Sequence, residues 1–308
     1  MDTRTLGPFE VSVVGLGCNN FGGRVDSKAT GAVVNVALDA GITLYDTADI
    51  YSEGKSEEYL GNALGSRRDE VVVASKFGME MPDGSGGSPA WVRQAADASL
   101  RRLGTDRIDL YQMHEPDNEV SLAETLGALS ELVTTGKVIA VGCSNASVEE
   151  IRQGLGTSDG DDLPQWVSVQ NEYSLLQRQP ESDGVLAECE LQGLGFLPFF
   201  PLASGVLTGK YRDASSPPDG TRLAGLPPER ASRFLSDSTV AQALKLEAFA
   251  ASHNHTLLEL AFGYLLSSPA VASVIAGATR VEQIAANAAA ASWVLSSDEA
   301  AKARDLTG

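Results

Sequence analysis

Short apolar segments recur along the chain at nearly even intervals, and a segment of helical pattern follows most of them. These apolar segments start near residues 42, 71, 108, 138, 167 and 195, so successive starts lie 29, 37, 30, 29 and 28 residues apart. Short runs rich in Val, Ile and Leu are typical of strands buried in a parallel sheet. The interval is the length of one strand-and-helix unit, so the pattern predicts that this unit repeats.

The pattern predicts eight strands, at 13–17, 42–48, 71–77, 108–114, 138–143, 167–171, 195–200 and 271–276. It predicts helices at 29–40, 56–65, 91–103, 121–135, 148–154, 184–193, 239–252, 256–267 and 281–291. Before them, a Gly-Pro turn at residues 7–8 lies between short β-prone pieces and indicates a hairpin. We therefore expect an α/β fold, a (β/α)8 TIM barrel with an N-terminal β-hairpin cap, in one domain over residues 1–308.

The regular spacing breaks once, because 76 residues separate the starts of the seventh and eighth strands. Part of this interval is a loop with four prolines, and long loops in compact domains are usually functional lids or disordered. We expect loops 18–25, 78–90 and 211–236 to set the substrate specificity. Their shapes, and whether 211–236 is ordered without a ligand, cannot be predicted from the pattern.

Charge and composition exclude several classes of function. The chain has 308 residues, 43% of them hydrophobic, and a formal net charge of −18. Nucleic-acid binding depends on clustered Lys and Arg, so it is not expected here, and any anionic ligand must be held by a few local cations. Residues 1–8 lack a leader pattern, and no apolar run approaches the roughly 18 residues of a membrane span. We expect a cytoplasmic protein that is not bound to membranes.

The cysteines and histidines do not indicate a metal site. Cys18, Cys143 and Cys189 are odd in number and lack metal-ligand spacing, so we expect buried thiols and neither disulfides nor zinc. His253 and His255 lie between two predicted helices without further ligands nearby. A dinucleotide fingerprint is also disfavoured, because the third glycine of G-x-G-x-x-G falls at Asn20.

Four titratable side chains follow three successive predicted strands. Asp46 lies near the end of the second strand and Tyr51 follows this strand, Lys76 closes the third and His114 closes the fourth. The carboxyl ends of parallel barrel strands meet at one mouth, where the active sites of such barrels lie. We therefore expect these four side chains to converge.

This set of side chains suits a reaction in which an oxygen gains negative charge and takes up a proton. Tyr51 can donate that proton if a cation favours its ionised form, and Lys76 can supply the cation. Asp46 would fix Lys76, and His114 would orient the substrate oxygen. Addition of hydride to a carbonyl carbon has these requirements, and because no side chain donates hydride, a nicotinamide cofactor is required.

Several segments resemble the aldo-keto reductase family, and the resemblance covers essentially the whole chain. Residues 41–48, Gly-Ile-Thr-Leu-Tyr-Asp-Thr-Ala, are similar to the family's N-terminal signature, and residues 142–145 are similar to its Gly-x-Ser-Asn segment. The resemblance implies a catalytic tetrad of Asp46, Tyr51, Lys76 and His114, with Tyr51 as general acid. It also implies a small carbonyl substrate and NADP(H) as cofactor.

The resemblance also implies a set of cofactor contacts spread over the last strand-and-helix units. They are Gly17, Ser144, Asn145, Gln170, Phe199, Leu202, Ser204, Gly205, Lys210, Gly277, Thr279, Arg280, Gln283 and Asn287. Phe199 would stack on the nicotinamide. Phe200 stands where the family usually has a serine, so the nearby backbone is expected to hold the pyrophosphate. Arg280 favours NADP over NAD.

Two other functions remain as alternatives. The first is a cofactor-binding regulatory protein on the same fold with little turnover, as in potassium-channel β subunits. The second is a hydrolase, but residues 142–146 lack the second glycine of G-x-S-x-G. The intact tetrad favours an enzyme. The sequence leaves open the physiological substrate, the oligomeric state and the strength of the NADPH preference.

Overall fold

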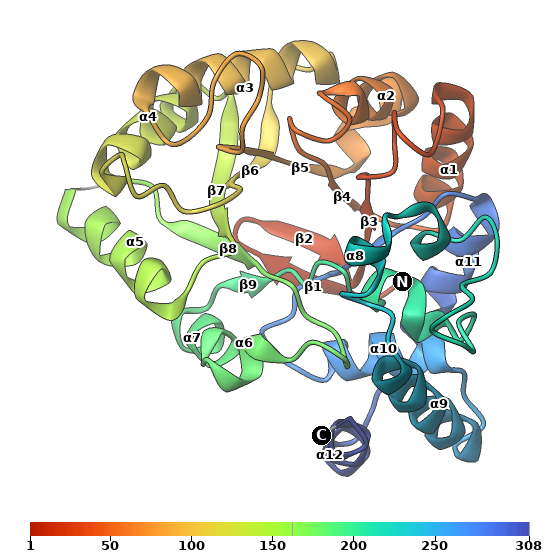
Figure 1. Ribbon diagram of the computed structural model, residues 1–308. Coiled ribbons are helices and arrows are strands. Elements are labelled where there is room, and N and C mark those ends of the chain that lie inside the picture. The colour runs from red at the N-terminus through yellow and green to blue at the C-terminus, as the bar shows by residue number, and fades with distance from the viewer. Residues whose placement is uncertain (162, 308) are drawn as a thin grey trace.

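Eight parallel strands form a curled sheet at the centre of the computed structural model, which describes residues 1–161 and 163–307 (Figure 1). Around the barrel the strands are β10 (Val274–Gly277), β3 (Val14–Gly17), β4 (Leu44–Asp46), β5 (Val72–Phe77), β6 (Ile108–Met113), β7 (Val138–Ser144), β8 (Trp166–Gln170) and β9 (Gly195–Phe196). A parallel bridge between Phe196 and Val271 joins the two ends of this order. The (β/α)8 TIM barrel expected from the sequence is confirmed.

An antiparallel hairpin of β1 (Thr3–Leu6) and β2 (Phe9–Ser12) lies across the ring of strands (Figure 1). Its side chains Leu6 and Val11 have no exposed surface and belong to one apolar cluster with residues from around the barrel, namely Leu44, Ala74, Leu110, Ala140, Leu197, Ala272 and Ile275. The predicted hairpin cap is therefore confirmed, and it supplies apolar packing to the barrel interior.

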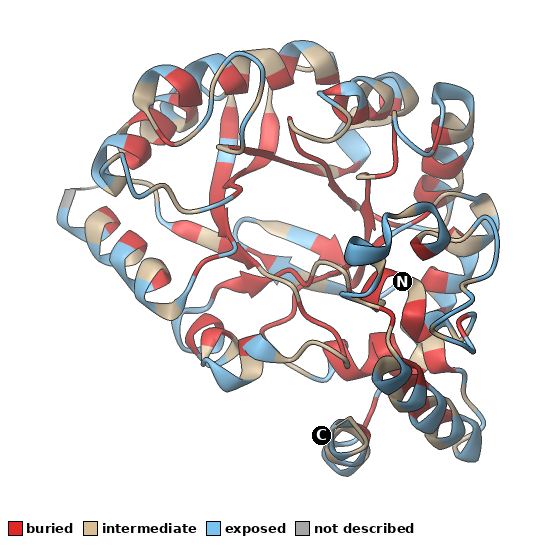
Figure 2. Ribbon diagram, viewed as in Figure 1, coloured by how far each residue is buried: buried red, intermediate tan, exposed pale blue. Residues whose placement is uncertain are grey.

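The helices surround the sheet, with their inward faces buried and their outward faces exposed (Figure 2). Those that alternate with strands are α1 (Ser27–Asp39), α2 (Lys55–Leu64), α3 (Pro89–Leu103), α4 (Leu122–Thr134), α5 (Val148–Asp161), α7 (Val185–Gln192), α10 (Leu257–Leu266) and α11 (Val281–Ala290). The others are α6 (Gln179–Ser182), α8 (Pro228–Ala231), α9 (Asp237–Ser252), α12 (Ser297–Asp305), and the 3-10 helices η1 (Gly65–Glu70), η2 (Ala203–Thr208) and η3 (Leu223–Gly225). Among the described residues, no helix is long and apolar enough to cross a membrane.

Three predicted strands are shorter or shifted in the structure. The strand predicted at 42–48 is β4 and spans only Leu44–Asp46. The strand predicted at 195–200 ends at Phe196 and continues only as an isolated bridge between Phe199 and Glu172. Hydrogen bonds to the β8 side continue past this point, because the Leu197 N–H donates to the Val169 carbonyl at 2.9 Å and the Phe199 N–H donates to the Asn171 carbonyl at 3.1 Å. Pro198, between them, lacks an N–H on the opposite side of the strand, where the hydrogen bonds of Phe196 with Ala270 and Ala272 are not continued. The strand predicted at 271–276 begins at Val274.

The helix predicted at 148–154 is α5, and it continues to Asp161. The sequence pattern predicts the end of this helix at Gly154, but this glycine has a packing role. A Cβ at this position would lie 2.0 Å from Nε1 of Trp166, so only glycine lets the helix approach β8 this closely.

The long segment after η2 folds back over the carboxyl ends of the strands. The Tyr211 hydroxyl accepts a hydrogen bond from the Leu223 N–H at 3.3 Å, and both residues are buried. Phe234 contacts Phe200 edge to face, with ring centroids 5.5 Å apart. Arg233, next to it, forms an ion pair with Glu172 at the end of β8. Residues 211–236 therefore form a packed cover over this end of the barrel.

Replacing Gly61 by alanine should destabilise the protein. The added Cβ would lie 2.1 Å from the Leu103 carbonyl oxygen, so α2 and α3 must move apart. We expect a loss of about 1–3 kcal/mol in the free energy of unfolding, measured by urea denaturation. Gly31 in α1 is the matched control, because its Cβ would meet nothing within 4 Å. Gly31→Ala should stabilise by about 0.5–1 kcal/mol; equal effects of the two changes would contradict the close α2–α3 packing.

Candidate active site

Three of the four predicted tetrad residues form one hydrogen-bonded group at the carboxyl end of the barrel. Asp46 is the last residue of β4, Lys76 lies in β5, and Tyr51 follows in the loop after β4. The Lys76 ammonium donates to Asp46 Oδ2 at 2.8 Å, to the Thr47 carbonyl at 2.7 Å and to the Tyr51 hydroxyl at 3.3 Å. Lys76 has no exposed surface. The strands thus bring together side chains that are far apart in the sequence.

Burial decides the proton state of the phenol. Burial raises the pKa of Tyr51 above its ordinary value, and the Lys76 ammonium opposes this shift without reversing it. The sequence predicted that Lys76 favours the ionised form, and Lys76 does act in that direction. The cost of placing a phenolate away from water is larger, and the sequence pattern did not show it. Tyr51 therefore keeps its proton at neutral pH.

The same balance has the opposite outcome for Lys76. Burial alone lowers the pKa of this ammonium. The Asp46 carboxylate and Tyr51 together raise the pKa by more than burial lowers it, so the net pKa is raised. Lys76 thus keeps its positive charge next to the phenol.

His114 completes the set and lies beside Tyr51. The two rings meet edge to face, with centroids 5.9 Å apart and an interplanar angle of 79°. Burial, together with the charge of Lys76, lowers the pKa of His114 to about 3. The imidazole is therefore neutral at physiological pH and can donate one N–H to a ligand oxygen.

A second layer of polar residues supports the tetrad. Gln170 on β8 donates from Nε2 to Asp46 Oδ1 at 2.9 Å, and Asn145 donates from Nδ2 to the His114 carbonyl at 3.0 Å. The Ser144 hydroxyl donates to the Gln170 carbonyl at 2.7 Å. Ser144 is buried behind the cavity wall and does not line the cavity. In this structure the Ser144 hydroxyl supports Gln170, and its predicted contact with a cofactor stays a prediction.

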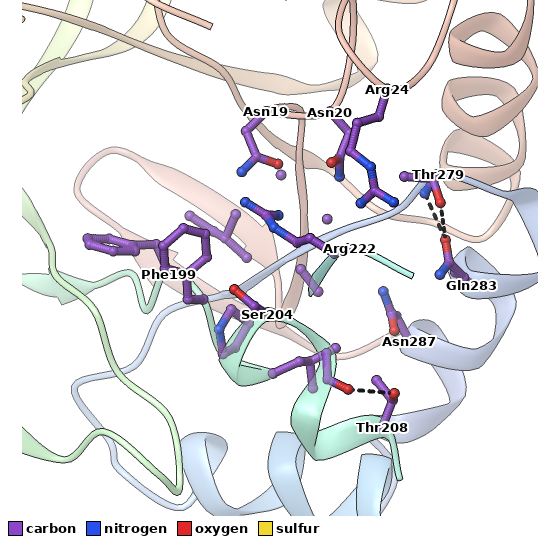
Figure 3. Close-up of a pocket in the computed structure, with 18 of the residues that line it drawn as sticks. Asn19, Asn20, Arg24, Phe199, Ser204, Thr208, Arg222, Thr279, Gln283 and Asn287 are labelled. Atoms are coloured by element: carbon purple, nitrogen blue, oxygen red, sulfur yellow. Dashed lines mark hydrogen bonds between the residues drawn. The ribbon is translucent and has the colours of Figure 1, made fainter. Parts of the chain in front are cut away.

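A cavity of about 660 Å³ opens from the tetrad and extends to the start of α11 (Figure 3). Of the residues predicted from the sequence, those that line it are Gly17, Asp46, Tyr51, His114, Asn145, Gln170, Phe199, Leu202, Ser204, Gly205, Lys210, Gly277, Thr279, Arg280, Gln283 and Asn287. Lys76 lies beneath the wall, where it contacts Asp46 and Tyr51. The described residues contain no group of three or more His, Cys, Asp or Glu side chains that could hold a metal ion.

The wall after β9 is built from strained backbone. Phe200, Ala203 and Ser204 have φ values of 50°, 45° and 55°, a region that non-glycine residues rarely adopt, and Gly205 follows with φ 96°. Such strain is found at ligand sites, where the surrounding structure holds it in place. The buried Ser204 hydroxyl lines the cavity and has no hydrogen-bond partner among the described residues (Figure 3). This unsatisfied group is suited to a polar ligand.

Four cations line the cavity, although the chain as a whole is strongly acidic. They are Arg24 after β3, Lys210 after η2, Arg222 at the start of η3, and Arg280 before α11. Burial and the three neighbouring arginines lower the pKa of Lys210. None of the four is in an ion pair with a carboxylate of the described residues, so their repulsion is relieved when an anion binds between them.

Arg24 and Arg222 were not identified from the sequence. Both point into the same space from different loops (Figure 3). They lie in the segments 18–25 and 211–236, which were predicted to set the substrate specificity, but no periodic pattern or motif distinguishes these arginines from surface charges. The net charge of −18 was the available signal, since it requires an anionic ligand to be held by local cations.

The far end of the cavity is formed by the N-terminus of α11. The Gln283 side-chain oxygen accepts a hydrogen bond from the Thr279 N–H at 2.7 Å (Figure 3). It also accepts from the Arg280 N–H at 3.1 Å. Asn287, one turn further along, is buried and also lines the cavity. The helix dipole adds positive potential here, which favours a phosphate group.

Comparison with known proteins agrees with this arrangement. The model of the Aldo/keto reductase family matches residues 13–307. The chain is 33% identical over 310 residues to the uncharacterized oxidoreductase YqkF of Bacillus subtilis, covering 98% of this chain and 95% of that protein. It is 32% identical over 283 residues to the L-glyceraldehyde 3-phosphate reductase of Escherichia coli, covering 87% and 80%.

Two further similarities bear on the function. The chain is 34% identical over 272 residues to a probable voltage-gated potassium channel subunit beta of Oryza sativa, covering 87% of this chain and 83% of that protein. The solved structure of aldo-keto reductase AKR11C1 from Bacillus halodurans, in its holo form, is similar with a TM-score of 0.82 and 30% identity. That match covers 99% of this chain and 96% of the other.

Removing the buried ammonium should destabilise the protein strongly. Lys76→Met leaves Asp46 as a buried carboxylate without its cation, so we expect a loss of about 3–5 kcal/mol in the free energy of unfolding. The double variant Lys76→Met, Asp46→Asn should recover part of this loss. Urea denaturation measures both. The exposed pair of Lys137 and Asp97 is the control, since Lys137→Met should cost less than about 1 kcal/mol.

If Lys76→Met proves as stable as Lys137→Met, the buried ion pair of Lys76 and Asp46 does not contribute the expected stability to the fold.

Proposed function

The chain belongs to the aldo/keto reductase family, and we propose that it reduces aldehydes or ketones to alcohols with NADPH, with Tyr51 as the proton donor. One observation carries this proposal. Tyr51, bonded to the buried pair of Lys76 and Asp46, opens onto the same cavity as four cations that lack carboxylate partners. A proton donor and an anion site in one cavity match a reaction between a carbonyl compound and an anionic dinucleotide.

The residues of the cavity fit such a dinucleotide from end to end. Phe199 would face the nicotinamide ring, with Asn145 and Gln170 near its carboxamide. Lys210, Arg222 and the strained backbone after Phe200 would hold the pyrophosphate. The α11 end, with Arg280, would hold the adenosine part and its additional phosphate. Bound there, the reduced nicotinamide supplies the hydride that adds to the carbonyl carbon.

The side chains of the tetrad then have separate roles. Neutral His114 donates a hydrogen bond to the carbonyl oxygen and orients it. Tyr51 gives its proton to that oxygen as negative charge develops there. The Lys76 ammonium stabilises the phenolate that remains, and Asp46 keeps the ammonium in position. The raised pKa of Tyr51 suits the direction of reduction, since the phenol must carry its proton when the reaction begins.

The second candidate is a cofactor-binding regulatory protein with little turnover. The similarity to a protein named as a potassium channel subunit beta is the observation in its favour. The complete tetrad favours an enzyme. Oxidation of NADPH should be measured with aldehydes, quinones, ketosteroids and sugar aldehydes, and with L-glyceraldehyde 3-phosphate, the substrate in the name of the Escherichia coli relatives. Turnover with any of these compounds would reject the regulatory role.

Tyr51→Phe should nearly abolish carbonyl reduction while leaving the fold and NADPH binding intact. The substitution removes only the phenolic oxygen, and a positioned proton donor contributes about 10²–10⁴ in rate. We therefore expect reduction of a simple aldehyde to slow by about a hundredfold or more, measured at saturating NADPH together with the cofactor dissociation constant. A rate within a few-fold of the parent, with unchanged binding, would show that Tyr51 is not the acid.

Arg280→Ala should narrow the preference for NADPH over NADH. A charge-assisted contact with the extra phosphate should favour NADPH by about tenfold or more, the equivalent of about 1.4 kcal/mol. Titration of nucleotide fluorescence measures both affinities. Arg304→Ala on α12 is the control, because this exposed arginine does not line the cavity. Equal affinities of the parent protein for the two nucleotides would remove Arg280 from the phosphate site.

A further inference from the structure

The loop that carries Tyr51 is strained immediately after the phenol. Ser52 and Glu53 have φ values of 52° and 55°, and Gly54 has 87°, so three successive residues are left-handed. Two of them are not glycine, and each such residue costs about 1 kcal/mol or more unless its surroundings hold it. The position of Tyr51 therefore depends on what lies beneath this loop.

Arg102 on α3 lies directly under the strained turn. A Cβ at Gly54 would be 2.5 Å from Arg102 Cδ, so the turn packs on the arginine side chain. The guanidinium donates from Nε to Glu57 Oε2 at 2.6 Å. Glu57 has no exposed surface, and its other oxygen accepts from the hydroxyl of Ser75, the residue before Lys76. Glu57 therefore connects the support of the loop to the strand that carries the catalytic lysine.

Asp49, between the tetrad residues Asp46 and Tyr51, is buried in the same place. It is 1% exposed, and neither carboxyl oxygen has a hydrogen-bond partner of good geometry among the described residues. The groups that act on it electrostatically come from four elements, namely Glu57 on α2, Arg102 on α3, Lys76 on β5 and Tyr111 on β6. Asp49 has no role in the proposed chemistry, yet it lies two residues before the proton donor Tyr51, and its N–H donates to the Lys76 carbonyl at 3.3 Å.

The charges around Asp49 balance without it. Lys76 pairs with Asp46 at 2.8 Å, and Arg102 pairs with Glu57 at 2.6 Å. An ionised Asp49 would be a third carboxylate sharing two cations, in a place that water does not reach. A neutral Asp49 leaves this buried group uncharged overall. Excess buried charge is expensive, so the neutral form is the one compatible with the packed loop.

We propose that Asp49 is a positioning residue that acts as a neutral carboxylic acid beneath the Tyr51 loop. In this form it allows residues 47–54 to pack on Arg102 and Glu57, and so holds the Tyr51 hydroxyl against Lys76. Loss of the proton from Asp49 adds repulsion toward Glu57 and loosens the loop. The effect on reduction rests on the proposed function, whereas the protonation of Asp49 does not.

The pH at which this happens follows from the surroundings of Asp49. Burial and the neighbouring Glu57 carboxylate raise the pKa of Asp49 to about 7, against the opposing effects of the Ile50 N–H, Arg102 and Lys76. The acid is therefore neutral below about pH 7 and ionised above it. Tyr51 should be well positioned on the acidic side of this midpoint and poorly positioned on the alkaline side.

The pH dependence of hydride transfer tests the proposal. Single-turnover rates of aldehyde reduction by the NADPH complex should fall by about tenfold as the pH rises through about 7, because misplacement by 1 Å can cost about a hundredfold. Asp49→Asn, which keeps the shape without the charge, should remove this fall and keep the low-pH rate. Glu53→Gln is the matched control, since it removes an exposed carboxylate from the same loop. It should keep the parent profile.

The proposal would be overturned if the rate of Asp49→Asn still fell with pH as in the parent protein. It would also be overturned if the rate of Glu53→Gln no longer depended on pH. A second measurement needs neither catalysis nor a folded variant. The infrared carbonyl band of a buried protonated carboxylic acid should be present in the wild-type protein at pH 6 and disappear as the pH is raised through about 7. If no such band titrates, Asp49 is not a neutral acid and the proposal fails. If the band titrates but no carbonyl compound is reduced, only the proposed function fails.

Discussion

The buried ammonium of Lys76 is the group on which this end of the barrel depends. A positive charge with no exposed surface is tolerated only when carboxylate and carbonyl oxygens surround it, and Asp46 and the Thr47 carbonyl meet that requirement. Both belong to the end of β4 and the residue after it. The third partner is the Tyr51 hydroxyl, at 3.3 Å. The need to surround the Lys76 ammonium with oxygen atoms therefore fixes the relative positions of β4, β5 and the loop between β4 and α2.

The cavity above this group shows the opposite balance of charge. Beneath the cavity wall, each cation pairs with a carboxylate, as Lys76 does with Asp46. In the cavity, four cations face one another without carboxylate partners in the described chain, namely Arg24, Lys210, Arg222 and Arg280. The two arrangements differ because one is closed to solvent and the other is open to a ligand. The closed part has its charges neutralised by the protein itself, and the open part is suited to neutralisation by a bound anion.

The sequence predicted the barrel, the hairpin and the convergence of the tetrad, because these follow from periodicity and from the rule that parallel strand ends meet. It predicted most of the cavity wall through a family resemblance. It could not predict Arg24 and Arg222, since a loop residue's direction depends on packing that no periodic pattern encodes. The sequence also could not predict the hydrogen bond from Ser144 to the Gln170 carbonyl or the raised pKa of Tyr51. Both depend on burial and on neighbours far away in the sequence.

The joint between β9 and β10 is the least hydrogen-bonded part of the ring. β9 has two residues and pairs with β8 at two positions, and a single bridge between Phe196 and Val271 joins it to the β10 side. Local unfolding begins where few backbone hydrogen bonds must break, so amide hydrogens at this joint should exchange with solvent sooner than those of β5 to β7. The strained segment 200–205 and the cover at 211–236 both leave from this joint. The ligand-facing wall can thus open locally while the strands that lead to Asp46, Lys76 and His114 keep their hydrogen bonds.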